Sequence, residues 1–205
     1  MTILRRAEYS ALRNIPLSGA VVDLGGEKRS EYHALFKGRF TVTTANLGGT
    51  DAPDVVLDLE KPLPFADASY DGALLINVLE HIFEYRQLLT ETARILKPGG
   101  KAVIVVPFLF PVHPSPEDYH RYTAAALEKA LVVSGFSDVC VFALGTGVCA
   151  ARFVLLERLF PPISFLTPFV YVLDGALASL ARMLGKKYRP SDYPLGYVVT
   201  AAKKA

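Results

Sequence analysis

Short apolar runs alternate with amphipathic stretches along most of this chain, and this alternation limits the possible folds more than any other feature. Apolar runs are typical of strands inside a sheet, whereas apolar residues three and four positions apart are typical of helices that cover one. This order of elements predicts an α/β fold with a mainly parallel sheet. The strands are expected at 20–24, 40–45, 54–58, 70–76, 101–107, 138–144 and 196–202.

Two helices and one long apolar insertion are expected between these strands. The first helix covers 85–96 and ends before Pro98 and Gly99, since neither residue continues a helix. The second covers 123–134, with Thr123 as its N-cap. The insertion covers about 146–194, and its longest uncharged run has 15 residues with three prolines. A membrane-spanning helix needs about 20 apolar residues, so we expect an apolar helical cap over the substrate cleft instead.

Composition and charge limit the class of protein. A chain of 205 residues with 51% hydrophobic and 20% charged residues suits one folded domain, 1–205. We divide it into a core at about 20–145, the cap, and the last strand at 195–205. The net charge of +2 gives no reason to expect a nucleic-acid partner. Two cysteines suit a reducing compartment, and 1–14 lacks the apolar core of a signal peptide, so we expect a cytoplasmic protein.

The first expected strand ends in Asp23-Leu24-Gly25-Gly26. Glycines at this point allow a ligand to approach the backbone closely, and the carboxyl edge of an open α/β sheet is where ligands bind. A plain tight turn would have the same sequence, so this feature alone does not identify the ligand.

Three further segments, in order, identify a family. They are 58–73, which begins Asp58-Leu59-Glu60-Lys61-Pro62, then 77–82, which reads Asn77-Val78-Leu79-Glu80-His81-Ile82, and 96–100, which reads Leu96-Lys97-Pro98-Gly99-Gly100. Together with the first turn they resemble the class I S-adenosylmethionine-dependent methyltransferases, and most closely the type 11 methyltransferase domain. The resemblance covers about 20–144. It implies a Rossmann-like, seven-stranded, mostly parallel sheet flanked by helices, with one antiparallel strand near an edge.

The resemblance also implies where S-adenosylmethionine binds. The first turn would face its methionine half, Asp58 would accept a hydrogen bond from the adenine amino group, and Leu59 would pack on the ring. Two positions depart from the family pattern. Glu27 stands where a second glycine is usual, which would strain the turn if φ is positive there, and Asn46 stands where an acid usually binds the ribose. The full expected set is Asp23, Gly25, Gly26, Glu27, Asn46, Asp58, Leu59, Asn77 and Val78.

The segment 107–123 after the fifth strand is rich in Pro, His and Tyr, and a loop at this edge shapes the substrate pocket. His113, Tyr119 and His120 are the expected catalytic residues, since an imidazole accepts a proton near neutral pH. His81 is a further candidate, and Arg121 is expected to pair with Glu117 or Asp118. No metal site is expected, because four dispersed histidines and two cysteines lack a zinc-ligand spacing.

The sequence therefore predicts a methyltransferase that uses S-adenosylmethionine on a small-molecule, glycan or lipid-linked acceptor. Two alternatives remain. A nicotinamide dehydrogenase is disfavoured by the missing third glycine, and a non-catalytic binding module is favoured by Glu27 and Asn46. The apolar segment 153–189 is expected either to bury itself as the cap, to form a homodimer, or to rest on a membrane with its basic residues near anionic headgroups.

Overall fold

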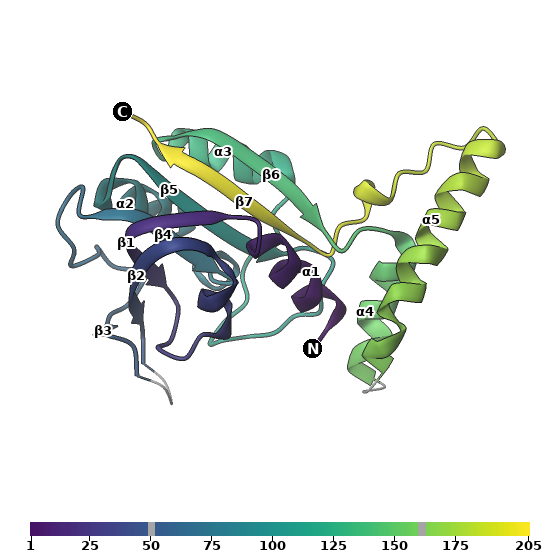
Figure 1. Cartoon of the computed structure of the whole chain (residues 1–205), viewed down its shortest axis with the longest axis horizontal. Coiled ribbons are helices and arrows are strands. Elements are labelled where there is room, and N and C mark those ends of the chain that lie inside the picture. Colours follow the sequence, from purple (N-terminus) through teal and green to yellow (C-terminus); the bar gives the residue numbers. More distant parts are fainter. Residues whose placement is uncertain (49–51, 160–162) are drawn as a thin grey trace.

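The computed structural model describes residues 1–48, 52–159 and 163–205. Its centre is a seven-stranded sheet in the order β3-β2-β1-β4-β5-β7-β6 (Figure 1). Every neighbouring pair is parallel except those that involve β7, which is antiparallel to both β5 and β6. This topology confirms the predicted fold class. The strands are β1 (Pro16–Leu24), β2 (Lys37–Asn46), β3 (Val55–Val56), β4 (Tyr70–Ile76), β5 (Leu96–Pro107), β6 (Phe136–Leu144) and β7 (Gly196–Lys203).

Helices cover both faces of the sheet. On one face, α2 (Tyr85–Ile95) and α3 (Ala124–Val133) pack their apolar sides against the central strands. On the other face, α1 (Ile3–Leu12) and α4 (Val148–Leu159) do the same. Burial on both sides explains why 72–76 of β4 and 102–107 of β5 are wholly apolar. Thr123 caps α3 as predicted, since its hydroxyl accepts a hydrogen bond from the Ala126 amide.

The connection from β1 to β2 differs from a usual βα unit. It holds only a short 3₁₀ helix, Glu31–Leu35, because β2 pairs with the full length of β1, from Pro16 beside Lys37 to Leu24 beside Ala45. The connection must therefore run back along the whole length of β1, about 30 Å, which would take roughly 20 residues of α-helix. Residues 25–36 cover that distance only in a more extended form. The predicted strand at 54–58 is likewise shorter than expected, with two residues in β3.

The apolar insertion is helical, as predicted, and forms a hairpin of α4 and α5 (Thr167–Met183) that projects from the end of the sheet at β6 and β7 (Figure 1). The buried carboxylate of Asp174 on α5 accepts hydrogen bonds from the amides of Cys149 and Ala150 at the start of α4. Glu157 on α4 accepts one from the Ile3 amide of α1 and so fixes the hairpin to the body. Pro161 and Pro162 lie outside the described residues. Within the described ranges, no helix is long and apolar enough to cross a membrane.

Candidate functional site

The carboxyl ends of β1, β2 and β4 open onto a crevice of about 350 Å³, which we call the main crevice. It is the place where an open α/β sheet binds a ligand. Six of the nine residues predicted to bind the cofactor line it: Gly25, Asn46, Asp58, Leu59, Asn77 and Val78. These six residues come from segments that are far apart in the chain, and the fold brings them to one surface.

The first turn is compact because Gly25 has no side chain. Its φ is +93°, and an added Cβ would lie 2.3 Å from Cγ2 of Val78 at the end of β4. The backbone of Glu27 is not strained in the way considered from the sequence, because its φ is not positive. It also does not line the crevice. The Glu27 backbone amide donates a hydrogen bond to Ser30 Oγ at 3.1 Å.

Asp23 lies behind the crevice instead of lining it. The side chain is fully buried, and its Oδ2 accepts hydrogen bonds from the Tyr32 hydroxyl at 2.7 Å and His33 Nε2 at 2.6 Å. Burial, followed by the Asp23 charge, raises the pKa of Tyr32, so its hydroxyl stays protonated as a donor. Gly26 is placed similarly, since an added Cβ would lie 1.9 Å from Asp23 Oδ2. These two residues hold the first turn in place.

The two polar residues predicted to bind the cofactor's sugar and base do lie at the crevice. Asn46 Nδ2 donates to the Gly25 carbonyl at 2.9 Å, so the side chain also ties β2 to the first turn. Asp58 Oδ1 accepts from the Glu60 amide at 3.0 Å, and Lys61 forms an ion pair with its other oxygen at 3.2 Å. The Glu60 amide, and then Lys61, lower the pKa of Asp58, which keeps it a charged acceptor at neutral pH.

A second cavity of about 530 Å³ adjoins the main crevice, and we call it the N-terminal cavity. It lies between α1, the end of β5 and the loop that follows β5. Asn77, His81 and Ser115 line both cavities, so the two share a boundary. Asn77 has a φ of +54°, which asparagine tolerates better than most residues, and this conformation places it between them.

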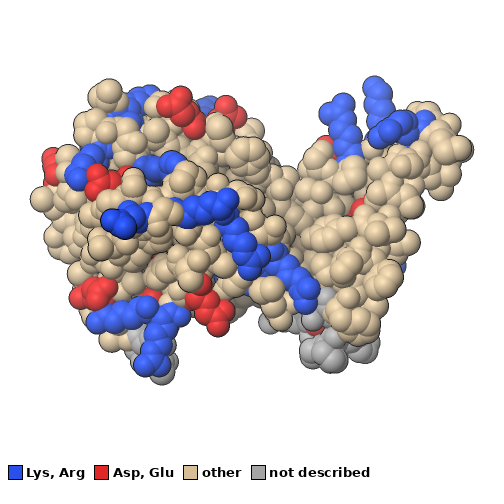
Figure 2. Space-filling view, in the orientation of Figure 1, with Lys and Arg blue, Asp and Glu red and all other residues tan. Residues whose placement is uncertain are grey.

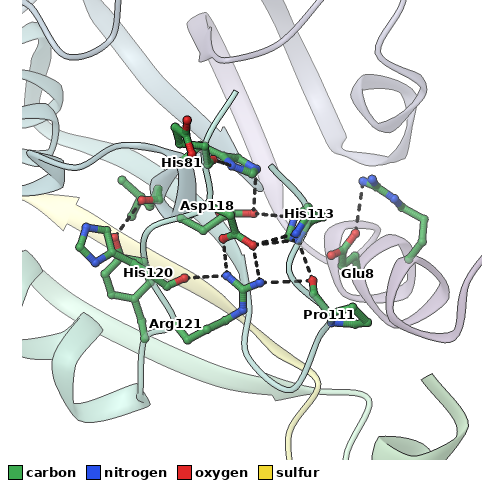
Figure 3. A network of polar contacts seen from close by, with 12 residues as sticks. Glu8, His81, Pro111, His113, Asp118, His120 and Arg121 are labelled. Carbon is green, nitrogen blue, oxygen red and sulfur yellow. Dashed lines mark hydrogen bonds and ion pairs between the residues drawn. The ribbon is translucent and has the colours of Figure 1, made fainter. Parts of the chain in front are cut away.

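The loop 108–123 is held by a polar network (Figure 3). Asp118 accepts from the His113 amide at 2.9 Å and from both terminal nitrogens of Arg121, and Arg121 NH2 also donates to the Pro111 carbonyl at 3.3 Å. This confirms the expected ion pair of Arg121 with Asp118. It also lowers the pKa of Asp118 to about 2, chiefly through Arg121. The network fixes His113 relative to the sheet.

The three predicted catalytic residues separate in space. His113 lines the N-terminal cavity, and Tyr119 lines the main crevice. His120 lines neither cavity. Its Nε2 lies 3.2 Å from the Phe83 carbonyl, and its ring packs against the rings of Phe83 and Tyr85. The geometry therefore gives His120 a structural position and leaves His113 facing the cavity.

The predicted cap does not roof this site. The described residues of the hairpin line neither cavity. Instead Val148, Ala151 and Leu155 face residues 108–111 of the loop across a third cavity of about 420 Å³. The reason is that α4 packs on α1 at the edge of the sheet, which directs the hairpin away from the crevice (Figure 1).

Two buried acids close to the N-terminal cavity were missed from the sequence. Glu80 is fully buried and Glu8 is 2% exposed, and burial raises the pKa of Glu8. A glutamate on an amphipathic helix such as α1 gives no signal that it is buried. The spacing argument against a metal site also missed a cluster, because the fold brings His113 back to Glu80 and His81. One ligand atom from each of these three lies within 4.8 Å of the others.

Comparison with known proteins agrees with this geometry. A family model described as a methyltransferase domain matches residues 39–104. The O-methyltransferase rstn1 of Aspergillus nomiae is 47% identical over 60 residues, which cover 29% of this chain and 27% of that protein. The demethylmenaquinone methyltransferase of Paenarthrobacter aurescens is 34% identical over 107 residues, which cover 50% and 42%. The chain thus matches less than half the length of these two relatives.

Solved structures match over nearly the whole chain. An S-adenosylmethionine-dependent methyltransferase from Mesorhizobium loti has a TM-score of 0.59 at 20% identity. The match covers 96% of this chain and 98% of that protein. Phosphoethanolamine N-methyltransferase 2 of Haemonchus contortus, in complex with S-adenosyl-L-methionine, has a TM-score of 0.59 at 19% identity and covers 96% and 52%. This chain therefore has the fold of the class I S-adenosylmethionine-dependent methyltransferases. The family match at 39–104 confirms the resemblance seen in the sequence.

Proposed function

We propose that this chain is a methyltransferase that binds S-adenosylmethionine in the main crevice and a small-molecule acceptor in the N-terminal cavity. The observation that carries this proposal is the boundary that the two cavities share at Asn77, His81 and Ser115. A methyl donor and an acceptor must meet in line, and two adjoining cavities at the carboxyl edge of the sheet provide for that contact.

The residues of the main crevice fit this cofactor. Asp58 is a charged acceptor for the adenine amino group, and Leu59, which is 6% exposed, offers an apolar surface for the ring. The absence of a side chain at Gly25 leaves the backbone open to close approach. When bound, S-adenosylmethionine supplies an activated methyl group. The protein then contributes mainly alignment and the exclusion of water, which together account for up to about 7–11 kcal/mol in favourable cases.

The acceptor end is assigned to His113. Its ring lines the N-terminal cavity, with Nδ1 3.1 Å from the Pro111 carbonyl and Nε2 3.7 Å from Glu80 Oε1. The Glu80 carboxylate raises the pKa of His113. Of the three predicted catalytic residues, His113 is the one that lines this cavity, so its imidazole is the proposed proton acceptor for a hydroxyl bound there. Tyr119 is assigned to the wall of the crevice, where it is 47% exposed.

We also propose that the hairpin rests on an anionic membrane surface. Its exposed apolar side chains lie along α5 and include Phe169, Val172, Leu173, Leu177 and Leu180. Figure 2 shows Lys and Arg side chains gathered at one end of the hairpin, next to a largely uncharged surface. The exposed basic residues there are Arg182, Lys186, Lys187 and Arg189. This combination matches the apolar face and charge of a peripheral membrane anchor, and it suits a lipid-linked or strongly apolar acceptor in a cytoplasmic protein.

Titration calorimetry tests the cofactor site. The folded protein is titrated with S-adenosylmethionine and with its demethylated product, and binding of both is expected. Asp58→Ala should weaken binding by about 1–3 kcal/mol, because the adenine amino group loses its acceptor. Glu128→Gln, on the exposed side of α3, is the control and should bind as the unaltered protein does. No heat at millimolar ligand would refute the enzymatic proposal and favour a non-catalytic binding module.

Vesicle flotation tests the hairpin. We expect the protein to float with anionic liposomes at low salt and to remain behind with neutral ones. Changing Lys186 and Lys187 to Glu should abolish flotation without altering cofactor binding. If light scattering instead shows a dimer that does not bind vesicles, the apolar face is a subunit interface and the membrane proposal is wrong.

A further inference from the structure

Glu80 is an ionisable side chain without a matching donor. It is fully buried, and neither carboxylate oxygen accepts a hydrogen bond from any residue in the described part of the chain. Nε2 of His81 and Nε2 of His113 each lie 3.7 Å from Glu80 Oε1, which is too long for a hydrogen bond. A buried carboxylate costs free energy unless a partner compensates for the lost water. The position therefore calls for a further positively charged group.

Both imidazoles are oriented to supply a lone pair at this point. His81 Nδ1 lies 2.5 Å from the Glu117 carbonyl, and His113 Nδ1 lies 3.1 Å from the Pro111 carbonyl. A carbonyl oxygen only accepts, so in each neutral ring the proton sits on Nδ1 and Nε2 keeps its lone pair. Histidines that bind metals have this same arrangement, with the remote nitrogen bonded to a carbonyl or carboxylate.

We propose that Glu80, His81 and His113 bind one divalent transition-metal ion. Zinc bonds to such ligands are about 2.0–2.2 Å long, so tetrahedral neighbours lie roughly 3.4 Å apart. Glu80 Oε1 lies 3.7 Å from Nε2 of each imidazole, and the three ligand atoms all lie within 4.8 Å of one another, so the side chains need to move inward by up to about 1.4 Å to close around an ion. Two imidazoles with a carboxylate suit zinc, iron or manganese better than magnesium.

The surroundings of the cluster favour a bound metal ion with one free coordination position. His81 and His113 line the N-terminal cavity, and so does Glu8, whose carboxylate is buried and carries one oxygen without a hydrogen bond among the described residues. That same oxygen, Oε2, forms an ion pair with Arg5 at 3.3 Å. Figure 3 shows Glu8 facing the loop that bears His113. Three protein ligands leave a coordination position that faces the cavity, as in metal sites that act on a bound molecule.

This inference extends the proposed function to the chemistry of the acceptor. An acceptor hydroxyl on the open coordination position would have a lowered pKa and lose its proton to solvent water. The acceptor oxygen then forms the new bond to carbon while the sulfur–methyl bond breaks and leaves a neutral thioether. With its Nε2 on the metal, His113 would act as a ligand and not as the proton acceptor. The acceptor class that follows is an oxygen compound able to coordinate a metal, such as a phenol or an enol.

Metal binding tests this without any methyl transfer. The untagged full chain is freed of metal with a chelator and titrated with Zn²⁺ by calorimetry, and with Co²⁺ by visible absorption. We expect one ion per chain, and a Co²⁺ spectrum with d–d bands and no thiolate charge-transfer band, since the cluster contains no cysteine. His113→Ala should weaken Zn²⁺ binding at least tenfold. His120→Ala, a histidine of the same loop that lies outside the cluster, is the matched control and should bind normally.

Glu80→Gln removes the central charge, but its buried position makes a folding check by circular dichroism necessary. His113 lies on a loop and its side chain is 30% exposed, so the alanine variant carries the test if the glutamine variant does not fold. Equal Zn²⁺ affinity in the unaltered protein and His113→Ala, or no binding in either, would overturn the inference and leave a buried ion pair. Zn²⁺ binding without S-adenosylmethionine binding would refute the proposed function alone. S-adenosylmethionine binding without Zn²⁺ binding would refute the metal site alone.

Discussion

Arg94 on α2 connects the segment that carries Asp58 and Leu59 to the rest of the fold. Its guanidinium donates to both oxygens of Glu91 at 2.8 Å, to the Phe65 carbonyl at 2.8 Å and to the Leu63 carbonyl at 3.0 Å. We predict that Arg94→Met, which keeps most of the aliphatic length, destabilises the protein strongly.

The expected magnitude follows from these contacts. Two backbone carbonyls lose a donor in a partly buried setting, at the low end of about 1–3 kcal/mol each. Breaking the two-bond pair with Glu91, whose side chain is 17% exposed, adds roughly 1 kcal/mol once solvent access is considered. The sum is about 3 kcal/mol, which for a chain of this size lowers Tm by about 6–12 °C.

Urea unfolding followed by circular dichroism measures this difference. Arg86→Met, an exposed arginine on the same helix, is the control and should change the free energy of unfolding by less than about 0.5 kcal/mol. Arg94 also lowers the pKa of Glu91. A lowered pKa stabilises the fold above the ordinary value of 4.5, and this contribution is lost as the pH falls through the folded-state pKa. The difference in the free energy of unfolding between Arg94→Met and the unaltered protein should therefore become smaller below about pH 4.5. A loss under 1 kcal/mol at pH 7, or a gap that is independent of pH, would refute this reasoning.

Three further changes test other parts of the structure. Gly25→Ala should lower both stability and S-adenosylmethionine affinity, measured by thermal melting and calorimetry, because its Cβ would lie 2.3 Å from Val78 at a φ of +93°; a normal affinity would contradict this. Tyr32→Phe should cost about 1–2 kcal/mol in urea unfolding, since the buried Asp23 loses its hydroxyl donor, and an unchanged midpoint would show that His33 alone suffices. Asp174→Ala should cost about 2 kcal/mol and increase hydrogen exchange at the start of α4, because two amides there lose their acceptor; exchange that stays slow would count against this cap.

The sequence by itself determined the class of fold and most of the main crevice. Apolar runs and a fixed order of glycines and acids are local features, so the strands at 70–76 and 101–107, the cap at Thr123 and the positions of Asp58 and Asn77 at the crevice could be predicted from the chain alone. Asn77 lies at the crevice because it directly follows a central parallel strand, and the carboxyl ends of such strands face the ligand edge of the sheet.

Only the tertiary structure decided which polar groups are buried and which loops meet. Asp23 lies at the end of β1 and Asp58 follows β3. The Asp23 side chain accepts from Tyr32 behind the first turn, whereas Asp58 lines the crevice, and no local pattern separates these outcomes. The cluster of Glu80, His81 and His113 exists because the loop after β5 folds back over the end of β4. The hairpin points away from the main crevice for a similar reason, since the packing of α4 on α1 sets its direction. Such contacts join residues that are distant in sequence, and their geometry depends on the whole fold.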